Sequence, residues 1–330
     1  GLDNDCDGVT DDGTSTADGD SDGWSIADGD CNDSDPLVNP GMVEVVPNFR
    51  DDNCDGWADF DGDYAWPELL ISGTTVDTAE DGLWLSGVVA HLLDPVEADG
   101  AINVLTNLSG LGAYVGSWQW SGSPLVRAGG LVMGEDTAFG PTGSHCVWLV
   151  AEGATATLTG STLSDCGGHG VNVSGGGVAL LDDVTIISPS QSGIYANSGV
   201  VLASAVSVSG PGEAGLHVAG LNADVTVTGM EVLGGAAGVI QIAGVLALDG
   251  FTSDGTASSA ISVSGGAAGF TNLDVPGAGN HGLAVTGGTV SVVGGVVGGV
   301  DGSGVSVSSA AVVTVDGLAV VGAGEDGVTV

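Results

Sequence analysis

Three short segments near the N-terminus have the residue spacing of a calcium-binding loop. They cover residues 3–8, 18–23 and 51–56, and each follows the pattern D-x-[DN]-x-[DN]-G. In such a loop, alternate side-chain oxygens surround one hard cation, and the glycine lets the backbone turn sharply. None of the three has the bidentate Glu at position 12 that closes an EF-hand, and no helical pattern flanks them. We therefore expect loop-only sites in which neighbouring loops share ligands.

The predicted metal ligands are carboxylates and side-chain amides grouped around these three loops. They are Asp3, Asp5, Asp7 and Asp11 in the first; Asp18, Asp20 and Asp22 with the downstream Asp28, Asp30, Asn32 and Asp33 in the second; and Asp51, Asn53, Asp55, Asp59, Asp61 and Asp63 in the third. Hard oxygen donors of this kind suit Ca²⁺, and no cluster of His or Met for a softer metal lies among them. We predict that the bound ion is Ca²⁺.

Acidic residues greatly outnumber basic residues in this chain. Its 330 residues include 42 acidic and 2 basic ones, Arg50 and Arg127, and the formal net charge is −40. Nucleic acids and anionic membrane surfaces are excluded as partners, because binding them requires Lys or Arg to neutralise phosphate. An acidic run is ordinarily a solvated tail, but here the acids alternate with Gly, Asn and Ser at ligand spacing, which favours metal binding. No apolar run reaches the roughly 18 residues of a membrane helix, so we expect no membrane span.

The cysteines provide candidates for two disulfides. Cys31 and Cys54 flank the middle of the acidic region, and Cys146 and Cys166 form a second candidate pair, which leaves Cys6 without an assigned partner. No CxxC pair is present, so a structural zinc site is disfavoured. Disulfides together with calcium loops predict an oxidising, calcium-rich compartment outside the cytoplasm.

Residues 1–59 resemble a known family of repeats. The segments that carry the resemblance are Asp18-Gly-Asp-Ser-Asp-Gly, Asp30-Cys31-Asn32-Asp33, Asn39-Pro40-Gly41, Glu44 and Asp52-Asn53-Cys54-Asp55-Gly56. They are similar to the metal-binding repeat of MopE-type bacterial surface proteins and to thrombospondin type 3 calcium repeats. The resemblance implies secretion, calcium in the loops and a disulfide between Cys31 and Cys54. Some family members are associated with copper, but the lack of soft ligands in this module favours calcium.

A different pattern repeats along the second half of the chain. Pairs of aliphatic residues separated by one variable residue recur every 21–24 residues, beginning at Val147, Val171, Ile194, Leu216, Ile240, Ile261, Leu283, Val305 and Val328. Period-two alternation is typical of a strand with an apolar inner face and a variable outer face. One coil of short strands per repeat predicts an all-β protein, a β-solenoid in which equivalent strands stack in parallel. The repeat resembles the right-handed parallel β-helix of pectate-lyase-like proteins, and the resemblance implies that fold.

These patterns divide the chain into three parts. We predict a loop-rich calcium-binding module over residues 1–64, irregular first coils or a cap over residues 65–144, and regular coils over residues 145–330. Within the middle part, residues 83–93 fit a short capping helix. Both ends of the chain interrupt a repeat, so we expect it to be a piece of a longer polypeptide.

Candidate catalytic residues in the solenoid are few. His145, His169 and His281 share one position in the repeat, which we interpret as a solvent-facing turn. Asp182 and Asp183 form the only Asp-Asp pair in the solenoid, whereas polysaccharide hydrolases need two or three converging carboxylates and lyases typically need a basic residue. From this we expect no enzymatic activity.

The predicted role is therefore structural. We expect a secreted or surface-displayed bacterial protein that acts as a stalk, an adhesin or a subunit of an extracellular filament and is rigidified by calcium. Its expected partners are further copies joined head to tail, or other cell-surface components. The alternative is a β-helix protein that binds or degrades polysaccharides.

Overall fold

The computed structural model describes two separate units, Gly1–Trp66 and Pro67–Val330. In the first, the described residues are 15, 17–43 and 51–54. In the second, they are 68–72, 75–86, 89–93, 97–105, 111–115, 119–120, 124–126, 130–135, 138–308 and 311–330. No helix among these residues has the length and apolar character needed to cross a membrane.

The described residues of the first unit form turns and loops around one short 3-10 helix, η1 (Ile26–Asp28). A disulfide joins Cys31 to Cys54, whose Cα atoms lie 5.5 Å apart, and so links two of the three acidic segments. Cys6 lies outside the described residues. The disulfide fixes the loop that it closes mainly by limiting the freedom of the unfolded chain.

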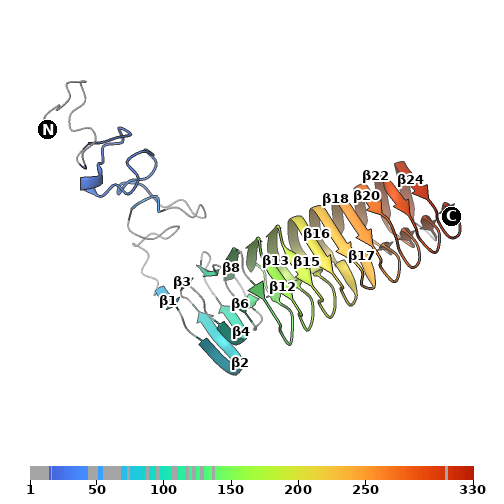
Figure 1. Ribbon diagram of the computed structural model, residues 1–330, viewed down its shortest axis with the longest axis horizontal. Helices are drawn as coiled ribbons and strands as arrows, with labels where there is room; N and C mark the ends of the chain where they lie inside the picture. Colours follow the sequence, from blue (N-terminus) through green and yellow to red (C-terminus); the bar gives the residue numbers. More distant parts are fainter. Residues whose placement is uncertain are drawn as a thin grey trace. The chain divides into compact units, whose positions relative to one another are not determined.

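The second unit is a right-handed parallel β-helix, as the repeat predicts (Figure 1). Its first strands are β1 (Glu68–Ser72), β2 (Thr75–Ser86), β3 (Val89–Leu93), β4 (Glu97–Leu105), β5 (Leu111–Val115), β6 (Gln119–Trp120), β7 (Pro124–Val126), β8 (Gly130–Glu135) and β9 (Ala138–Phe139). The capping helix expected over residues 83–93 is wrong, because this segment belongs to β2 and β3. There Leu83 pairs with Ile102 and Ala90 with Ala113 in parallel ladders.

The regular coils follow from residue 147. Their strands are β10 (Val147–Leu149), β11 (Thr155–Thr159), β12 (Thr162–Ser164), β13 (Val171–Asp182), β14 (Thr185–Ile187), β15 (Ile194–Ser209), β16 (Ala214–Leu233), β17 (Ala237–Gln241), β18 (Val245–Asp254), β19 (Ile261–Val263), β20 (Ala267–Val275), β21 (Leu283–Val285), β22 (Thr289–Gly298), β23 (Val305–Val307), β24 (Val312–Val321) and β25 (Val328–Thr329). Each coil has three strand segments, and each segment pairs in parallel with its equivalent in the next coil.

The register between coils follows the predicted repeat except in one coil. Val147 pairs with Val171, and Ile194 pairs with Leu216, as expected. In the fifth coil, however, Leu216 pairs with Val239 rather than with Ile240. Gln241, expected on the outer face, is fully buried instead, and its Nε2 donates to the carbonyl of Ala267 at 3.0 Å. The sequence is ambiguous here because several aliphatic residues follow one another.

The core consists of inward-facing aliphatic side chains reinforced by three buried aromatic rings. Phe139, Phe251 and Phe270 are among the largest fully buried side chains. A disulfide between Cys146 and Cys166 joins the start of one coil to the last turn of the same coil, with Cα atoms 5.3 Å apart. Stacked coils bury these side chains on both sides, so the apolar surface supplies most of the stabilisation.

Backbone corners separate the second and third strand segments of each coil. The corner residue has a left-handed conformation in successive coils, for example Asp183 (φ 53°), Gly229 (φ 68°) and Asn272 (φ 53°). Glycine, asparagine and aspartate are the residues that adopt this conformation most readily. The tight corners keep the second and third strand segments of every coil in constant register.

A stack of imidazole and phenol rings runs across four consecutive coils. The ring of His169 lies parallel to His145 at 5.0 Å and to Tyr195 at 4.4 Å, and Tyr195 meets His217 edge-on at 5.2 Å. The Nδ1 atom of His145 accepts the backbone N–H of His169, and the Nδ1 of His169 accepts that of Ser192. His169 is only 6% exposed, so our interpretation of this position as a solvent-facing turn is wrong. The imidazoles brace one coil against the next.

This bracing requires neutral imidazoles, because a protonated Nδ1 cannot accept a hydrogen bond. Burial lowers the pKa of His145. Burial, with a smaller effect from neighbouring His145, lowers the pKa of His169 from 6.5 to about 4. Between these two values the unfolded chain binds a proton at His169 and the folded chain does not. The contribution of His169 to stability is therefore present above pH 6.5 and is lost as the pH falls toward 4.

Replacing His169 should make stability less sensitive to acid. At pH 7 the His169→Phe variant keeps the stacked ring but loses the acceptor for Ser192, so it should be somewhat less stable than the parent. Between pH 6.5 and 4.5, its free energy of unfolding in urea should fall less than that of the parent, by about 2 kcal/mol.

Ser198→Ala is the matched control. The Oγ of Ser198 also accepts a backbone N–H from a neighbouring coil, that of Gly176 at 3.1 Å, but a hydroxyl does not titrate between pH 4 and 7. Its pH dependence should match that of the parent protein. An equal acid sensitivity in His169→Phe and the parent would contradict the role of His169.

Candidate functional site

The second acidic loop brings three carboxylates together. Oxygen atoms of Asp18, Asp20 and Asp22 lie within 4.8 Å of one another. The backbone folds around them because Asp18 accepts the N–H groups of Ser21 (2.7 Å) and Gly23 (2.9 Å). Three carboxylates therefore lie around one point, which is the arrangement that a hard cation requires.

The residues present fit a metal ion. One oxygen of Asp20 and one of Asp30 are buried and have no hydrogen-bond partner among the described residues. Partial desolvation raises the pKa of Asp20, and the charges of Asp22, Asp30 and Asp18 add to this effect. Buried, unpaired oxygens and a destabilised charge are what a cation would satisfy.

Two of the downstream acids that we predicted as shared ligands accept hydrogen bonds within the module instead. Asp33 accepts the backbone N–H of Gly19 at 2.9 Å, and Asp28 accepts the hydroxyl of Ser25 at 2.7 Å. These contacts hold the loop in shape from the outside. Of the remaining predicted ligands, Asn32, Asp51 and Asn53 are described but lie outside the three-carboxylate group, and Asp3, Asp5, Asp7, Asp11, Asp55, Asp59, Asp61 and Asp63 lie outside the described residues.

A second set of carboxylates converges on the third strand segment of three successive coils. Glu231 on β16 pairs with Thr252 on β18, and Thr252 pairs with Asp274 on β20. Asp254 lies two residues beyond Thr252 on the middle strand, and all three acids are exposed on the outer side. We call Glu231, Asp254 and Asp274 the carboxylate face.

The spacing of the carboxylate face follows from β-sheet geometry. Coils lie about 4.8 Å apart and residues about 3.3 Å apart along a strand, so the Cα atoms of neighbouring members are about 8–10 Å apart. Sequence reasoning missed this set, because its members are separated by about one coil and therefore never appear as a pair. Aligning the acids at the repeat interval would have found them.

Two other exposed acids of the solenoid, Asp249 and Asp182, are hydrogen-bonded to the next coil. The carboxylate of Asp249 accepts the hydroxyl of Thr271 and the Nδ2 of Asn272, and these hydrogen bonds lower its pKa. Asp182 accepts the hydroxyl of Ser204 in the next coil. These carboxylates hold adjacent coils together, whereas no such side-chain hydrogen bond is recorded for the carboxylate face within the described residues.

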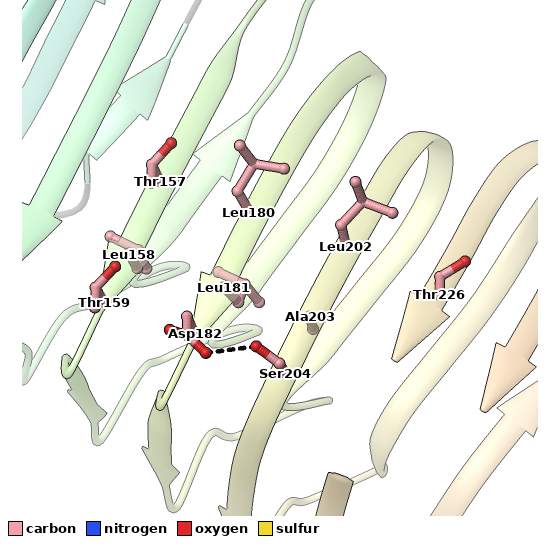
Figure 2. Close-up of a pocket in the computed structure, with 10 residues that line it drawn as sticks. All are labelled: Thr157, Leu158, Thr159, Leu180, Leu181, Asp182, Leu202, Ala203, Ser204 and Thr226. Atoms are coloured by element: carbon pink, nitrogen blue, oxygen red, sulfur yellow. Dashed lines mark hydrogen bonds between the residues drawn. The ribbon is translucent and has the colours of Figure 1, made fainter. Parts of the chain in front are cut away.

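A shallow groove of about 260 Å³ crosses the second strand segment of four coils (Figure 2). We call it the strand groove, and its lining residues are Thr157, Leu158, Thr159, Leu180, Leu181, Asp182, Leu202, Ala203, Ser204 and Thr226. Figure 2 shows Leu180 and Leu202 side by side on neighbouring strands, with the Asp182–Ser204 hydrogen bond beside them. The groove is thus aliphatic along one row and polar along the next.

Models of two protein families match the chain, one in the N-terminal module and one in the β-helix. Residues 1–12 and 30–59 match the metal-binding motif of MopE type, and residues 145–259 match the right handed beta helix region. No curated protein matches the chain.

One solved structure shares the fold. It is the catalytic domain of a GH87 alpha-1,3-glucanase variant in complex with nigerose, with 12% sequence identity and a TM-score of 0.51. The match covers 80% of this chain and 60% of that one. A catalytic domain is therefore built on this fold, and our expectation that the chain is not an enzyme is corrected. That expectation rested on the lack of a basic residue for a lyase and on acids adjacent in sequence, whereas stacking places acids from different coils on one surface.

The recognition made from the sequence is confirmed: the chain carries a MopE-type metal-binding motif followed by a right-handed parallel β-helix.

Proposed function

We propose that this chain is an extracellular protein that binds and hydrolyses a polysaccharide, with a calcium-stabilised module ahead of its β-helix. The observation that carries the proposal is the carboxylate face, where the coil register brings Glu231, Asp254 and Asp274 onto one surface. The likeness to a glucanase catalytic domain supports the same class of reaction. Two disulfides and the MopE-type motif support an extracellular location.

The spacing of the carboxylate face suits hydrolysis with inversion. In that mechanism one carboxyl group protonates the glycosidic oxygen while a carboxylate on the other side deprotonates the attacking water. The two groups must lie roughly 6.5–9.5 Å apart to leave room for the water. Backbone positions about 8–10 Å apart allow the outward-pointing carboxyl groups to reach this separation, whereas the two groups of an enzyme with a covalent intermediate lie only about 5 Å apart.

We further propose that Asp18, Asp20, Asp22 and Asp30 hold Ca²⁺. Once bound, the ion would neutralise the carboxylates and fix the loop at residues 18–23, just ahead of the segment that the Cys31–Cys54 disulfide closes. All of these donors are hard oxygens, which favour Ca²⁺ over the softer copper. The helix pairs of an EF-hand sensor are missing from the described part of the module, so the ion stabilises a structure and does not switch it.

Calcium binding should depend on the converging carboxylates. By calorimetry, Asp20→Asn should weaken Ca²⁺ binding roughly tenfold or more, because it removes one charged ligand. Chelation should lower the melting temperature of the parent protein by several degrees, because an ion that binds the folded state stabilises it. The control Asp301→Asn, which removes an exposed acid in a turn of the solenoid, should bind like the parent. Tight Cu²⁺ binding without Ca²⁺ binding would contradict the assignment.

Hydrolysis should depend on the carboxylate face. Release of reducing ends from α-1,3-glucan and other polysaccharides should fall by about 10²–10⁴-fold in Glu231→Gln, Asp254→Asn or Asp274→Asn, whichever two serve as acid and base. The third substitution should have a smaller effect. Asp326→Asn, an exposed acid outside the face, should retain full activity, and all variants should melt like the parent because the side chains point outward.

If the parent releases no reducing ends from any polysaccharide, or if Asp326→Asn loses as much activity as the face variants, the proposal is wrong. The earlier expectation of a stalk, adhesin or filament subunit would then be favoured. Light scattering at high protein concentration would test the head-to-tail association that this role requires.

A further inference from the structure

The strand groove has an amphipathic pattern that repeats from coil to coil. One outer row contains Thr157, Leu180, Leu202 and Thr226 in register, so two leucines lie between two hydroxyl-bearing residues. The neighbouring row contains Thr159, Asp182 and Ser204, which are all polar. Leu202 is 47% exposed, although most aliphatic residues of these coils point inward.

A polysaccharide chain is complementary to this pattern. A sugar ring presents apolar C–H groups on its faces and hydroxyls around its edge. The faces would cover Leu180 and Leu202 and remove apolar surface from water. The edge hydroxyls would exchange hydrogen bonds with Thr157, Thr226 and the Oδ2 atom of Asp182, since Oδ1 accepts the Ser204 hydroxyl.

Charge restricts which polysaccharides the groove accepts. The chain has no lysine, and its two arginines, Arg50 and Arg127, both lie outside the described residues. Asp182 lines the groove and Asp224 lies exposed on a strand that borders it. A polymer with carboxylate or sulfate groups would bring negative charge against these acids, and the described residues include no Lys or Arg to pair it. The same charge, −40 for the whole chain, opposes a second copy as the occupant.

We infer that the strand groove binds a polysaccharide without acidic groups, whose sugar rings lie over Leu180 and Leu202. This inference rests on the proposed function and names the class of polymer and the surface that holds it. The groove extends over β11, β13, β15 and β16, and β16 also carries Glu231 of the carboxylate face. Both surfaces therefore belong to one rigid set of coils.

Paired polymers test the inference. Binding is measured by calorimetry on the Glu231→Gln/Asp254→Asn variant, which lacks at least one member of any acid–base pair on the face, so that the polymer stays intact. The probes are soluble neutral glucans of several linkages, each compared with the carboxymethyl derivative of the same backbone. At least one neutral glucan should bind, and its carboxymethyl derivative should bind roughly tenfold more weakly or worse at low salt.

Substitution of the leucines tests the surface. Leu180→Ser combined with Leu202→Ser should weaken binding of the neutral glucan roughly tenfold or more, because two aliphatic contacts are lost. Val245→Ser is the matched control, since Val245 is 51% exposed on the same outer sheet face in a later coil. It should bind within twofold of the parent, and all variants should melt alike.

Several results would overturn the inference. They are equal or tighter binding of the carboxymethyl derivative, unchanged binding in the double serine variant, or a dimer in light scattering that the double variant abolishes. Hydrolysis by the parent protein is measured in a separate experiment. If no hydrolysis occurs, the proposed activity of the carboxylate face is wrong, while the binding measurements still test whether the strand groove binds the polysaccharide.

Discussion

The parallel hydrogen bonds between successive coils are the constraint on which the rest of the β-helix depends. They set one side chain of each coil directly above its equivalent in the next, about 4.8 Å away. Residues separated by one turn of the chain thus become immediate neighbours. The ring stack from His145 to His217, the Asp182–Ser204 hydrogen bond and the carboxylate face are three consequences of the same register. A shift of one residue would move each of these groups to the opposite face of its strand.

Negative charge is the second general constraint on this chain. With no lysine and two arginines against 42 acids, the protein cannot neutralise its carboxylates by ion pairs. The β-helix instead engages some of them with hydroxyls of adjacent coils, as at Asp249 and Thr271. The N-terminal loop brings Asp18, Asp20 and Asp22 close together, where a cation would neutralise them. The proposed substrate class follows from the same imbalance, because a polymer without acidic groups is the one that this surface does not repel.

The fold could be predicted from the sequence because every coil repeats one simple pattern, an aliphatic residue at alternate positions after a turn. The predicted register or element was wrong where this pattern fits more than one alignment. Val239, Ile240 and Ile242 fit either register, and only the structure shows that Gln241 points inward to bond backbone carbonyls. The segment 83–93 is rich in apolar residues that suit a helix or a strand, and its pairing with other coils decided the outcome.

The two candidate sites differ in how well they could be predicted from the sequence. The acids of the Asp18 loop are close together in sequence, so their spacing reveals the site. Glu231, Asp254 and Asp274 are brought together only by the coil register, and that register becomes definite once Val239 is aligned with Leu216. The central claim is that these carboxylates hydrolyse a polysaccharide at the spacing of an inverting enzyme. The most direct test is to follow the anomeric configuration of the newly released sugar by NMR during hydrolysis. The account predicts inversion, and retention of configuration would contradict it.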